Sequence, residues 1–538
     1  MEATFARLSR NAAILIFLIC LTFAAYTRHA WEDYLITFRA SLNLATGSGL
    51  VYQAGERVHS FTSPLGTLLP ALFALGGGPN VETRALWIFR LVGAAALGIA
   101  VLRTGHEFHR SQLAAWSAIL GFGLWVFDSK VVDFSINGME TALLIFFIVL
   151  TWQAFVTGAK LWPLAAGFGG LQWTRPDGFV FFAALALSWL YLGEQPASPA
   201  PPKSWRMVFK AMVLGALIYL PWVLFAWLYY GSPIPHTILA KQFHHPLMEL
   251  AASLGLYPVR LLFGHVAIHD IFMPAYFYFG GWPHGLLWFA RLLGTVAALT
   301  WLWPGVKPSG RVASAALFLG GFYLQYIPGS PWYFPGWQVL ACISWAYLFD
   351  ALGQRAKNAG RVNSVSEKLV RMTGLTFVAI QALLLLAVAW QMRIQQDLIE
   401  NNHRREIGLW LHDHAAKQDR VYLEPLGYIG FYSGLKMLDN PGLASPEVVT
   451  VRRAGEASHA GIIAILKPEW LVLRPDQVQT VNESAPQLLD QNYHLTRVFD
   501  ARPRLNAIRL IPGRGYLDFD ARFLVYSRLA KSSPHGSH

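Results

Sequence analysis

Long apolar stretches recur along most of this chain and constrain its fold more than any other feature. A helix that crosses a membrane needs about 20 mostly apolar residues, or somewhat fewer where the bilayer is thin. About eleven stretches meet this requirement before residue 393. They lie near residues 11–28, 85–103, 112–127, 139–157, 160–174, 178–193, 208–229, 285–303, 311–327, 333–352 and 372–392. Only 14% of the residues are charged, so we expect an α-helical polytopic membrane protein.

The distribution of positive charge predicts the orientation of the spans. A net charge of +12 would suggest a nucleic-acid partner in a soluble protein, but membrane proteins collect Lys and Arg in cytoplasmic loops. If residues 63–77, which are short and contain Pro70, form an interfacial helix and not a span, the basic loops all fall on one side. That side is then cytoplasmic, and no nucleic-acid partner is expected. The loops carry Arg7 and Arg10, Arg103 and Arg110, Lys160, Lys203 and Arg206, Lys307 and Arg311, and the cations of 355–371.

Two parts of the chain differ in character. Residues 1–392 form the predicted transmembrane domain, in which 28–84 make the first outer loop with interfacial helices. In 393–538 charges of both signs return, and short apolar runs alternate with turn residues. We expect 393–538 to form a soluble α/β domain on the outer face. Within the first outer loop, 47–52 are expected to form a turn and a short strand.

An acid pair, Glu32 and Asp33, directly follows the first span. Two adjacent carboxylates at a membrane surface repel each other and are partly desolvated, so that at least one should have a raised pKa, as suits a general base. The structural alternative is the acidic start of a helix, where the helix dipole favours carboxylates.

A series of motifs follows along the predicted outer segments. The first outer loop contains the run EDYLITFRASLNLATGSGLVYQAGERVHSFTSPLGTLLPAL from residue 32 onward. The later motifs are NGMET at 137–141, TRPDG at 174–178, YYGSPIPHTILAK at 229–241, PWY at 331–333, GFYSGL at 430–435 and DNPGL at 439–443. In this series the chain resembles the membrane glycosyltransferases of the GT-C superfamily, in the branch that includes the mycobacterial terminal arabinofuranosyltransferase.

The resemblance implies a reaction and a place for it. Enzymes of this kind move a sugar from a polyprenyl-phosphate donor to a hydroxyl acceptor at the outer membrane face, with inversion at the anomeric carbon. For this chain it implies D-arabinofuranose as the sugar, a glycan, glycolipid or protein as the acceptor, and the inner membrane of a bacterium with the active site facing the periplasm. The family carries paired Asp after the first span. Its usual base is the first of the pair, which is Glu32 here, so Glu32 and Asp33 are both candidates.

The same reaction needs cations for the leaving phosphate and groups that bind sugar. Arg gives bidentate phosphate contacts and Lys acts as a point charge. The candidates for donor phosphate are Arg175, Lys241, His236 and His244, and those for substrate are Glu140, Asp177, Arg57, Trp332 and Tyr333.

These residues could also have a purely structural role in place of a role in the site. Arg175 could be a cation that snorkels at a helix end, and Glu140 could stabilise the start of the next span. Trp332 and Tyr333 could belong to an interfacial aromatic belt. Lys241 ends a Pro-containing segment whose nonhelical backbone at membrane depth must line a cavity or be buried in protein, which favours a site.

No cofactor is predicted to be required. The spacing of His265 and His269 would place two imidazoles on one helix face, as in some zinc sites, but Asp270 is the one acidic neighbour. A divalent cation beside the carboxylates and the phosphate would make physical sense.

Two other functions compete with this one. The same chemistry with mannose or aminoarabinose is the nearest alternative. A lipid or sugar transporter would place ionisable groups near the midplane of its spans and show repeat symmetry, whereas the polar clusters here fall at one predicted membrane face.

Overall fold

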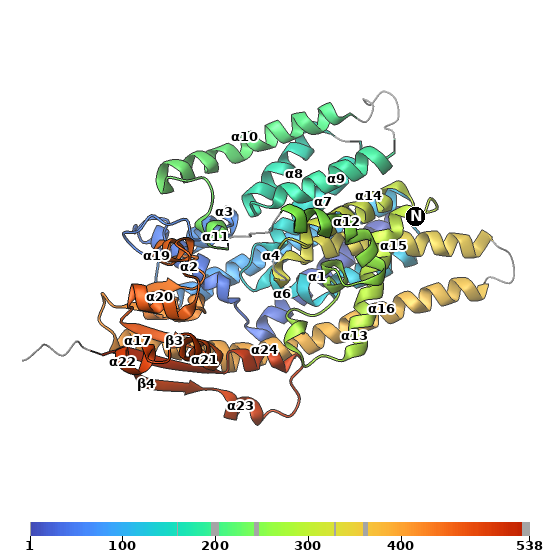
Figure 1. The fold of residues 1–538 in the computed structure, drawn as a ribbon. Helices are drawn as coiled ribbons and strands as arrows, with labels where there is room; N and C mark the ends of the chain where they lie inside the picture. Colours follow the sequence, from blue (N-terminus) through green and yellow to red (C-terminus); the bar gives the residue numbers. More distant parts are fainter. Residues whose placement is uncertain are drawn as a thin grey trace, which may run out of the picture.

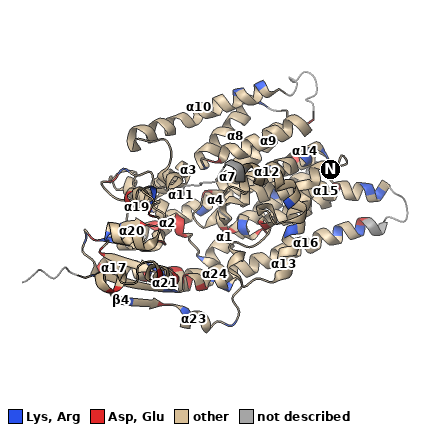
Figure 2. Cartoon of the chain, viewed as in Figure 1, with Lys and Arg blue, Asp and Glu red and all other residues tan. Residues whose placement is uncertain are grey.

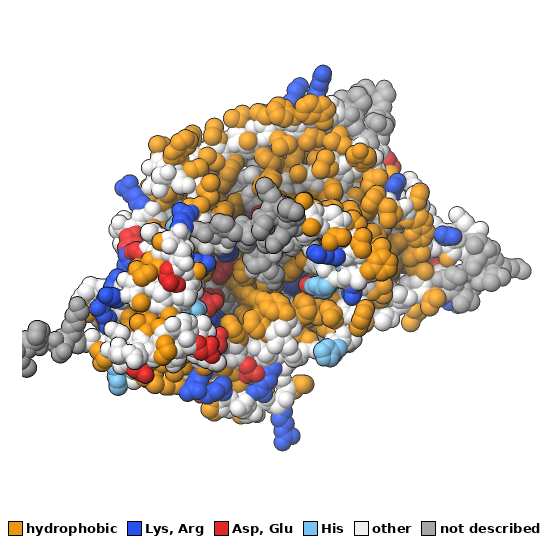
Figure 3. Space-filling view, in the orientation of Figure 1, with side chains coloured by type: hydrophobic (Ala, Val, Ile, Leu, Met, Phe, Trp, Pro, Cys, Tyr) orange, Lys and Arg blue, Asp and Glu red, His pale blue; other side chains and the backbone are white. Residues whose placement is uncertain are grey.

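The computed structural model describes residues 2–158, 160–194, 204–241, 247–327, 330–358 and 364–529. Long helices run side by side through most of the molecule, and a small sheet domain from the C-terminal part lies at one end of them (Figure 1). Apolar side chains cover much of the helical part on the face that Figure 3 shows. This surface is expected where helices face lipid.

Each predicted apolar stretch forms a helix. These helices are α1 (Glu2–Thr27), α4 (Val81–Arg110), α5 (Ala115–Val126), α7 (Thr141–Val156), α8 (Leu161–Thr174), α9 (Gly178–Leu192), α10 (Trp205–Tyr230), α13 (His284–Leu299), α14 (Pro308–Leu324), α15 (Pro335–Asn358) and α16 (Ser364–Ile394).

Not all of these helices are long enough to be counted as spans by length alone. Among the described residues, five helical segments are long and apolar enough to cross a membrane, and α6 (Ser129–Ile136) with α7 makes a sixth if this pair, bent by 118°, is one broken span. The five are Thr4–Thr27, Val81–Arg110, Trp205–Tyr230, His284–Leu302 and Glu367–His414. Several others are short, down to the 12 residues of α5. The chain is therefore a multi-pass membrane protein, and the number of about eleven spans stays a prediction.

Short helices and turns connect the long ones. They are α2 (Glu32–Ala45), α3 (Pro64–Ala74), α11 (His236–Lys241), α12 (Leu247–Phe263), η1 (Ala267–Asp270), η2 (Phe277–Phe279), η3 (Thr300–Leu302) and η4 (Pro331–Tyr333). Helix α3 falls within the stretch predicted to be an interfacial helix. It starts where the Ser63 side chain accepts a hydrogen bond from the Gly66 N–H at 2.9 Å.

The short strand expected within 47–52 is wrong, because this segment is a loop. The Asn43 side-chain amide donates to the carbonyls of Val51 and Tyr52 at 2.8 and 3.1 Å. These bonds tie the segment to α2, and it pairs with no strand of the described chain.

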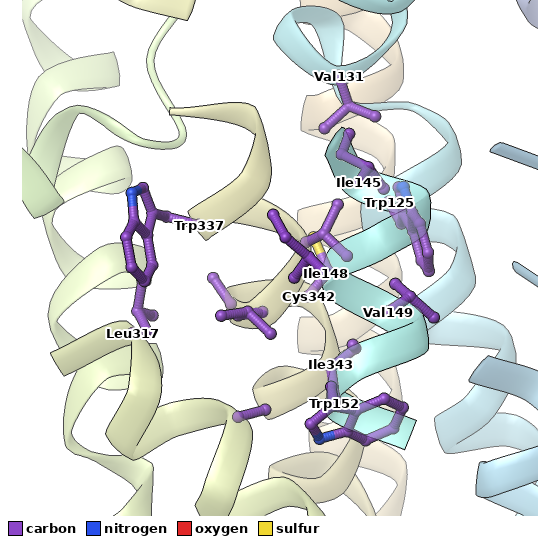
Figure 4. Close-up of a cluster of buried hydrophobic side chains, with 14 of the residues drawn as sticks. Trp125, Val131, Ile145, Ile148, Val149, Trp152, Leu317, Trp337, Cys342 and Ile343 are labelled. Atoms are coloured by element: carbon purple, nitrogen blue, oxygen red, sulfur yellow. The ribbon is translucent and has the colours of Figure 1, made fainter. Parts of the chain in front are cut away.

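The core of the helical part is packed between α5, α7, α14 and α15. Figure 4 shows Trp125 of α5, Trp152 of α7 and Trp337 of α15 in this core, and all three side chains are buried. Since lipid chains are as apolar as these side chains, close packing rather than exclusion of water holds such helices together. A Cβ atom on Gly121 would lie 2.4 Å from the Cβ of Ala346, so glycine lets α5 approach α15.

The C-terminal domain has the predicted α/β composition. Its five-stranded sheet has the order β2-β1-β3-β5-β4, with β1 parallel to β2 and β3, and β5 antiparallel to β3 and β4. The strands are β1 (Arg420–Leu423), β2 (Lys436–Asp439), β3 (Trp470–Leu473), β4 (Tyr493–Asp500) and β5 (Arg522–Arg528). The helical elements are η6 (Gln395–Arg404), a π-helix, with α17 (Arg405–His414), α18 (Leu426–Ser433), α19 (Pro446–Arg453), α20 (His459–Leu466), α21 (Pro475–Ser484), α22 (Leu488–Asn492), α23 (Arg502–Asn506) and α24 (Arg514–Phe519).

Helix α18 docks the C-terminal domain onto α2. The Arg39 side chain of α2 donates to the carbonyls of Gly430 and Leu435 at 2.6 and 3.1 Å. A Cβ atom on Gly427 would lie 2.2 Å from the carbonyl oxygen of Glu32. Gly427 is thus required for the close approach of α18 to the acid pair.

Charge is distributed unevenly along the molecule. In Figure 2, Lys and Arg gather at the end of the bundle where α10 begins and α15 ends, whereas most Asp and Glu lie around α2 and the C-terminal domain. This distribution agrees with the predicted topology, while the orientation in a membrane stays a prediction.

Candidate active site

The acid pair lies in the first turn of α2, where the helix dipole favours carboxylates. The N–H of Trp31, the residue before the helix, donates to the carbonyl of Asn137 at 2.8 Å. This bond fixes the start of α2 against the turn between α6 and α7. The two carboxylates have different neighbours, and this difference separates their roles.

Glu32 points toward the C-terminal domain. Its carboxylate lies 3.0 Å from Arg404 Nη1 and accepts a hydrogen bond from the Gly427 N–H at 3.2 Å. Buried Arg404 also pairs with the carboxylates of Glu400 and Asp520. Burial raises the pKa of Glu32 to about 7, and Arg404 opposes this rise. Glu32 is therefore engaged in a contact between α2 and the C-terminal domain.

Asp33 differs from Glu32 in its contacts. Within the described part of the chain, its carboxylate forms no ion pair and accepts no hydrogen bond from another residue. Burial raises the pKa of Asp33, and the positive charges of Lys241 and Arg175 partly offset the rise. A carboxylate with free oxygens and a raised pKa is suited to accept a proton.

Arg175 directly follows α8 and is held by acidic and aromatic partners. Its guanidinium lies 2.9 Å from Asp177 and 3.4 Å from Glu140, and it covers the ring of Tyr333 at 4.5 Å. The Tyr323 hydroxyl donates to Asp177 at 2.7 Å. Burial tends to raise the pKa of Asp177, but the charge and hydrogen bonds of Arg175 together with the Tyr323 hydroxyl lower it overall. These contacts compensate the charge of Arg175 and fix its orientation.

Lys241 supplies a second cation at the end of α11. Its Nζ lies 5.7 Å from the centre of the Trp332 ring, and the described residues include no acidic partner in contact with it. The Trp332 ring packs edge-on against Trp31 at 6.2 Å. Trp31 in turn stacks on Tyr276 at 5.5 Å. The aromatic rings thus form a wall that joins Lys241 to the start of α2.

The structure brings together most of the residues predicted from the sequence. The group contains Asp33, Glu140, Arg175, Asp177, Lys241, Trp332 and Tyr333, which come from α2 and from the ends of α7, α8, α9, α11 and η4. Glu32 lies beside this group but turns toward Arg404.

Three predicted residues are not part of this group. The imidazole of His236 faces Asp439 and Glu447 of the C-terminal domain, and burial lowers its pKa. The Arg57 guanidinium lies over the ring of Tyr229 at 5.1 Å. His244 lies outside the described residues.

The described residues do not form a metal site. No three His, Cys, Asp or Glu side chains within the described ranges gather so as to hold a metal ion. His265 pairs with Asp270 at 3.0 Å, and His269 Nε2 contacts the carbonyl of Leu261 at 3.0 Å. The described residues thus offer no ligand set for a divalent cation.

Sequence reasoning missed two residues that hold the site. Arg404 pairs with Glu32 from the far end of η6, and Tyr323 of α14 bonds Asp177. Tyr323 lies within an apolar span and looks like ordinary lipid-facing or core sequence. Arg404 follows a polar segment, Gln395–His403, whose unusual π-helical geometry is the one local sign of a special position.

Known proteins resemble this chain in sequence and in fold. Residues 391–526 match a family described as a domain of unknown function (DUF8728). A terminal beta-(1->2)-arabinofuranosyltransferase of Corynebacterium glutamicum is 32% identical over 248 residues, and the Mycobacterium tuberculosis protein of the same name is 27% identical over 225 residues. These matches cover 41% and 39% of this chain but only 34% of each relative. The chain thus matches about a third of the length of these relatives.

The fold extends the resemblance over the whole chain. The apo crystal structure of ArnT from Cupriavidus metallidurans aligns with 97% of this chain and 99% of its own, with a TM-score of 0.52 at 12% identity. The chain resembles the GT-C glycosyltransferases. The resemblance predicted from the outer-loop motifs is therefore confirmed, both in sequence against the arabinofuranosyltransferases and in fold against ArnT.

Proposed function

We propose that this chain is a glycosyltransferase that moves a sugar from a polyprenyl-phosphate donor to a hydroxyl group of an acceptor. The observation that carries the proposal is the Asp33 carboxylate within the field of the Lys241 cation. Among the described residues neither group has a partner of opposite charge in direct contact. A base beside a free cation meets the two main needs of the reaction, removal of a proton and stabilisation of a leaving phosphate.

In the proposed mechanism Asp33 accepts the proton of the acceptor hydroxyl. The acceptor oxygen then forms a bond to the anomeric carbon on the face opposite the phosphate, and the bond between that carbon and the phosphate oxygen breaks. The configuration inverts, and polyprenyl phosphate leaves with the bonding electron pair. Lys241 holds the departing phosphate through a charge-assisted hydrogen bond.

The group around Arg175 is proposed to bind the sugar. Since Asp177 and Glu140 compensate the charge of Arg175, its main task is to orient these carboxylates toward sugar hydroxyls, with a smaller electrostatic contribution to phosphate binding. The rings of Trp332 and Tyr333 offer apolar faces for the sugar ring. Glu32 has a positioning role in this scheme, because it is bound to Arg404.

The proposed sugar is D-arabinofuranose, because both curated relatives are named for arabinofuranosyl transfer. Mannose or aminoarabinose carried by the same kind of lipid is the alternative. The acceptor is proposed to be a glycan, a glycolipid or a protein. We place the enzyme in a bacterial inner membrane with its active site and C-terminal domain toward the periplasm, since the basic loops are predicted to be cytoplasmic.

A lipid or sugar transporter is the competing class of function. A transporter is expected to bind its substrate near the middle of the bilayer. Here the site lies at helix ends and on short outer helices, next to a domain outside the bundle. This location favours a reaction at the membrane surface.

The proposal is tested by supplying the purified protein in detergent with polyprenyl-phosphate arabinose, mannose or aminoarabinose and with oligosaccharide acceptors. Mass spectrometry of the products is expected to show an acceptor heavier by one pentose from the arabinose donor. Sugar movement into proteoliposomes without a new glycosidic bond would instead establish a transporter.

A further inference from the structure

A cavity lies beside α2, outside the group of residues around Asp33. It has a volume of about 380 Å³ and opens where the end of α1 and the start of α4 meet η6 and α18. Its lining combines cations, amides and aromatic rings, and includes Arg28, Asn80, Glu82, Trp87, Arg90 and Arg405. Asp33, Lys241 and Arg175 are not among the lining residues, so this cavity is separate from the site of the proposed function.

Positive charge dominates the walls of this cavity. Arg28, Arg90 and Arg405 face one carboxylate, that of Glu82. Within the described part of the chain, none of the three arginines forms an ion pair with an acidic side chain. Arg405 lies over the Tyr432 ring at 4.8 Å, which holds its guanidinium in place without neutralising it.

Arg90 is the most informative of these cations because it is only 2% exposed. Its guanidinium donates to the carbonyls of Ile136 and His29 at 2.8 and 2.6 Å and lies over the Trp87 ring at 4.8 Å. Carbonyl oxygens orient the cation but carry no net charge, and the nearby Asp133 carboxylate, which attracts Arg90 without a direct ion pair, is itself paired with His29 at 3.2 Å. A buried charge is costly unless it is compensated, so a bound anion in the adjacent cavity would offset this cost.

The start of α4 adds backbone donors on the same side. Asn80 stands at the N-cap but makes no side-chain cap hydrogen bond, and the first-turn residues Glu82 and Thr83 line the cavity. The N–H groups of a helix start and its dipole favour an anion. Together with the buried Arg90, the start of α4 favours an anion in this cavity.

We propose that this cavity binds a phosphate ester. Guanidinium groups bind phosphate oxygens in pairs of parallel hydrogen bonds, and three of them line this space. The cavity lies at the ends of two long apolar helices, α1 and α4. A lipid headgroup can therefore reach it from the bilayer and a phosphorylated glycan from the solvent.

The test compares the two sources with the full chain in detergent. Dihexanoyl phosphatidylglycerol, kept below its critical micelle concentration, serves as the lipid probe, glycerol 3-phosphate as the soluble probe, and dihexanoyl phosphatidylcholine as the zwitterionic reference. Binding is measured by native mass spectrometry and calorimetry.

Two variants test the role of the arginines. The variant Arg28→Gln/Arg405→Gln removes two exposed cations that line the cavity. The control Arg84→Gln removes an exposed cation near the start of α4 that does not line the cavity.

We expect saturable binding of at least one phosphate probe, weakened about tenfold or more in the double variant and unchanged in Arg84→Gln. Binding of phosphatidylglycerol alone identifies a lipid headgroup, and equal binding of glycerol 3-phosphate identifies a soluble phosphate ester. Absence of saturable binding would overturn the proposal, as would equal weakening in Arg84→Gln or binding of phosphatidylcholine that the double variant leaves unchanged. Because neither Arg28 nor Arg405 belongs to the Asp33 site, these outcomes do not depend on transferase activity.

Discussion

Replacing Lys241 with Gln is expected to change two measurable properties together. Lys241 has no acidic partner among the described residues. Its full positive charge is therefore available to a bound phosphate. A hydrogen bond to a charged group contributes roughly 1.5–3 kcal/mol, which corresponds to roughly 10- to 150-fold in donor affinity. Lys241→Gln should raise the donor KM by this factor, whereas the acceptor KM should change little.

The same substitution should move the pH profile of the reaction. Lys241 is the strongest of the cations that lower the pKa of Asp33. The base acts only when it is deprotonated, so activity is lost as the pH falls through its pKa. Without Lys241 that pKa is higher, and the acidic limb of kcat/KM should shift upward by about one pH unit.

Initial rates across donor concentration and pH measure both effects in one series. Lys241→Arg, which keeps the charge, should leave the acidic limb in place, and Lys417→Gln, which removes an exposed lysine of the C-terminal domain, should leave both properties unchanged. A Lys241→Gln enzyme with the wild-type donor KM and the wild-type acidic limb would refute the assignment of Lys241 to the phosphate and to the field around Asp33.

Three further predictions concern the contact between α2 and the C-terminal domain. Arg404→Gln leaves the buried Glu400 without its cation, whereas Asp520 keeps Arg474, and it should destabilise the fold by about 3 kcal/mol, seen as a lower thermal midpoint. Arg393→Gln, which breaks a partly exposed pair, should cost about 1 kcal/mol at most. Gly427→Ala should lower the midpoint because its Cβ would meet the Glu32 carbonyl, while Gly255→Ala, with open space around it, should not. The folded-state pKa of Glu32 is raised to about 7, so its contribution to stability is present at low pH and lost as the pH rises through 7. The midpoint of the wild type should therefore fall relative to Glu32→Gln between about pH 5 and pH 8, and parallel curves would contradict the raised pKa.

The helices were predictable from the sequence because apolar stretches of span length leave the backbone few alternatives in a membrane. The C-terminal sheet was also predictable, from short apolar runs such as 421–423 and 470–473, which form β1 and β3. The expected strand within 47–52 was wrong, because an apolar run forms a strand only where a partner strand is available, and here Asn43 binds the carbonyls of Val51 and Tyr52.

The sequence allowed the residues of the candidate site to be predicted, but not the directions in which their side chains point. Motifs identify Arg175, Asp177 and Lys241, since Lys and Arg concentrate on the cytoplasmic side and are unusual on the predicted outer face. They cannot separate Glu32 from Asp33, because adjacent residues of a helix point about 100° apart, and the choice depends on neighbours that the fold brings from elsewhere. Arg404, which binds Glu32, is such a neighbour.

The central claim is that Asp33, and not Glu32, accepts the proton, and single-turnover transfer from saturating donor tests it most directly. Asp33→Asn should lower the rate constant about 100-fold or more at neutral pH, and Asp33→Glu should retain part of the activity. Glu32→Gln should keep most of the rate, because the amide can still bond the Gly427 N–H and Arg404 loses only one of its carboxylate partners. A full rate in Asp33→Asn together with loss of transfer in Glu32→Gln would contradict the claim and assign the base to Glu32.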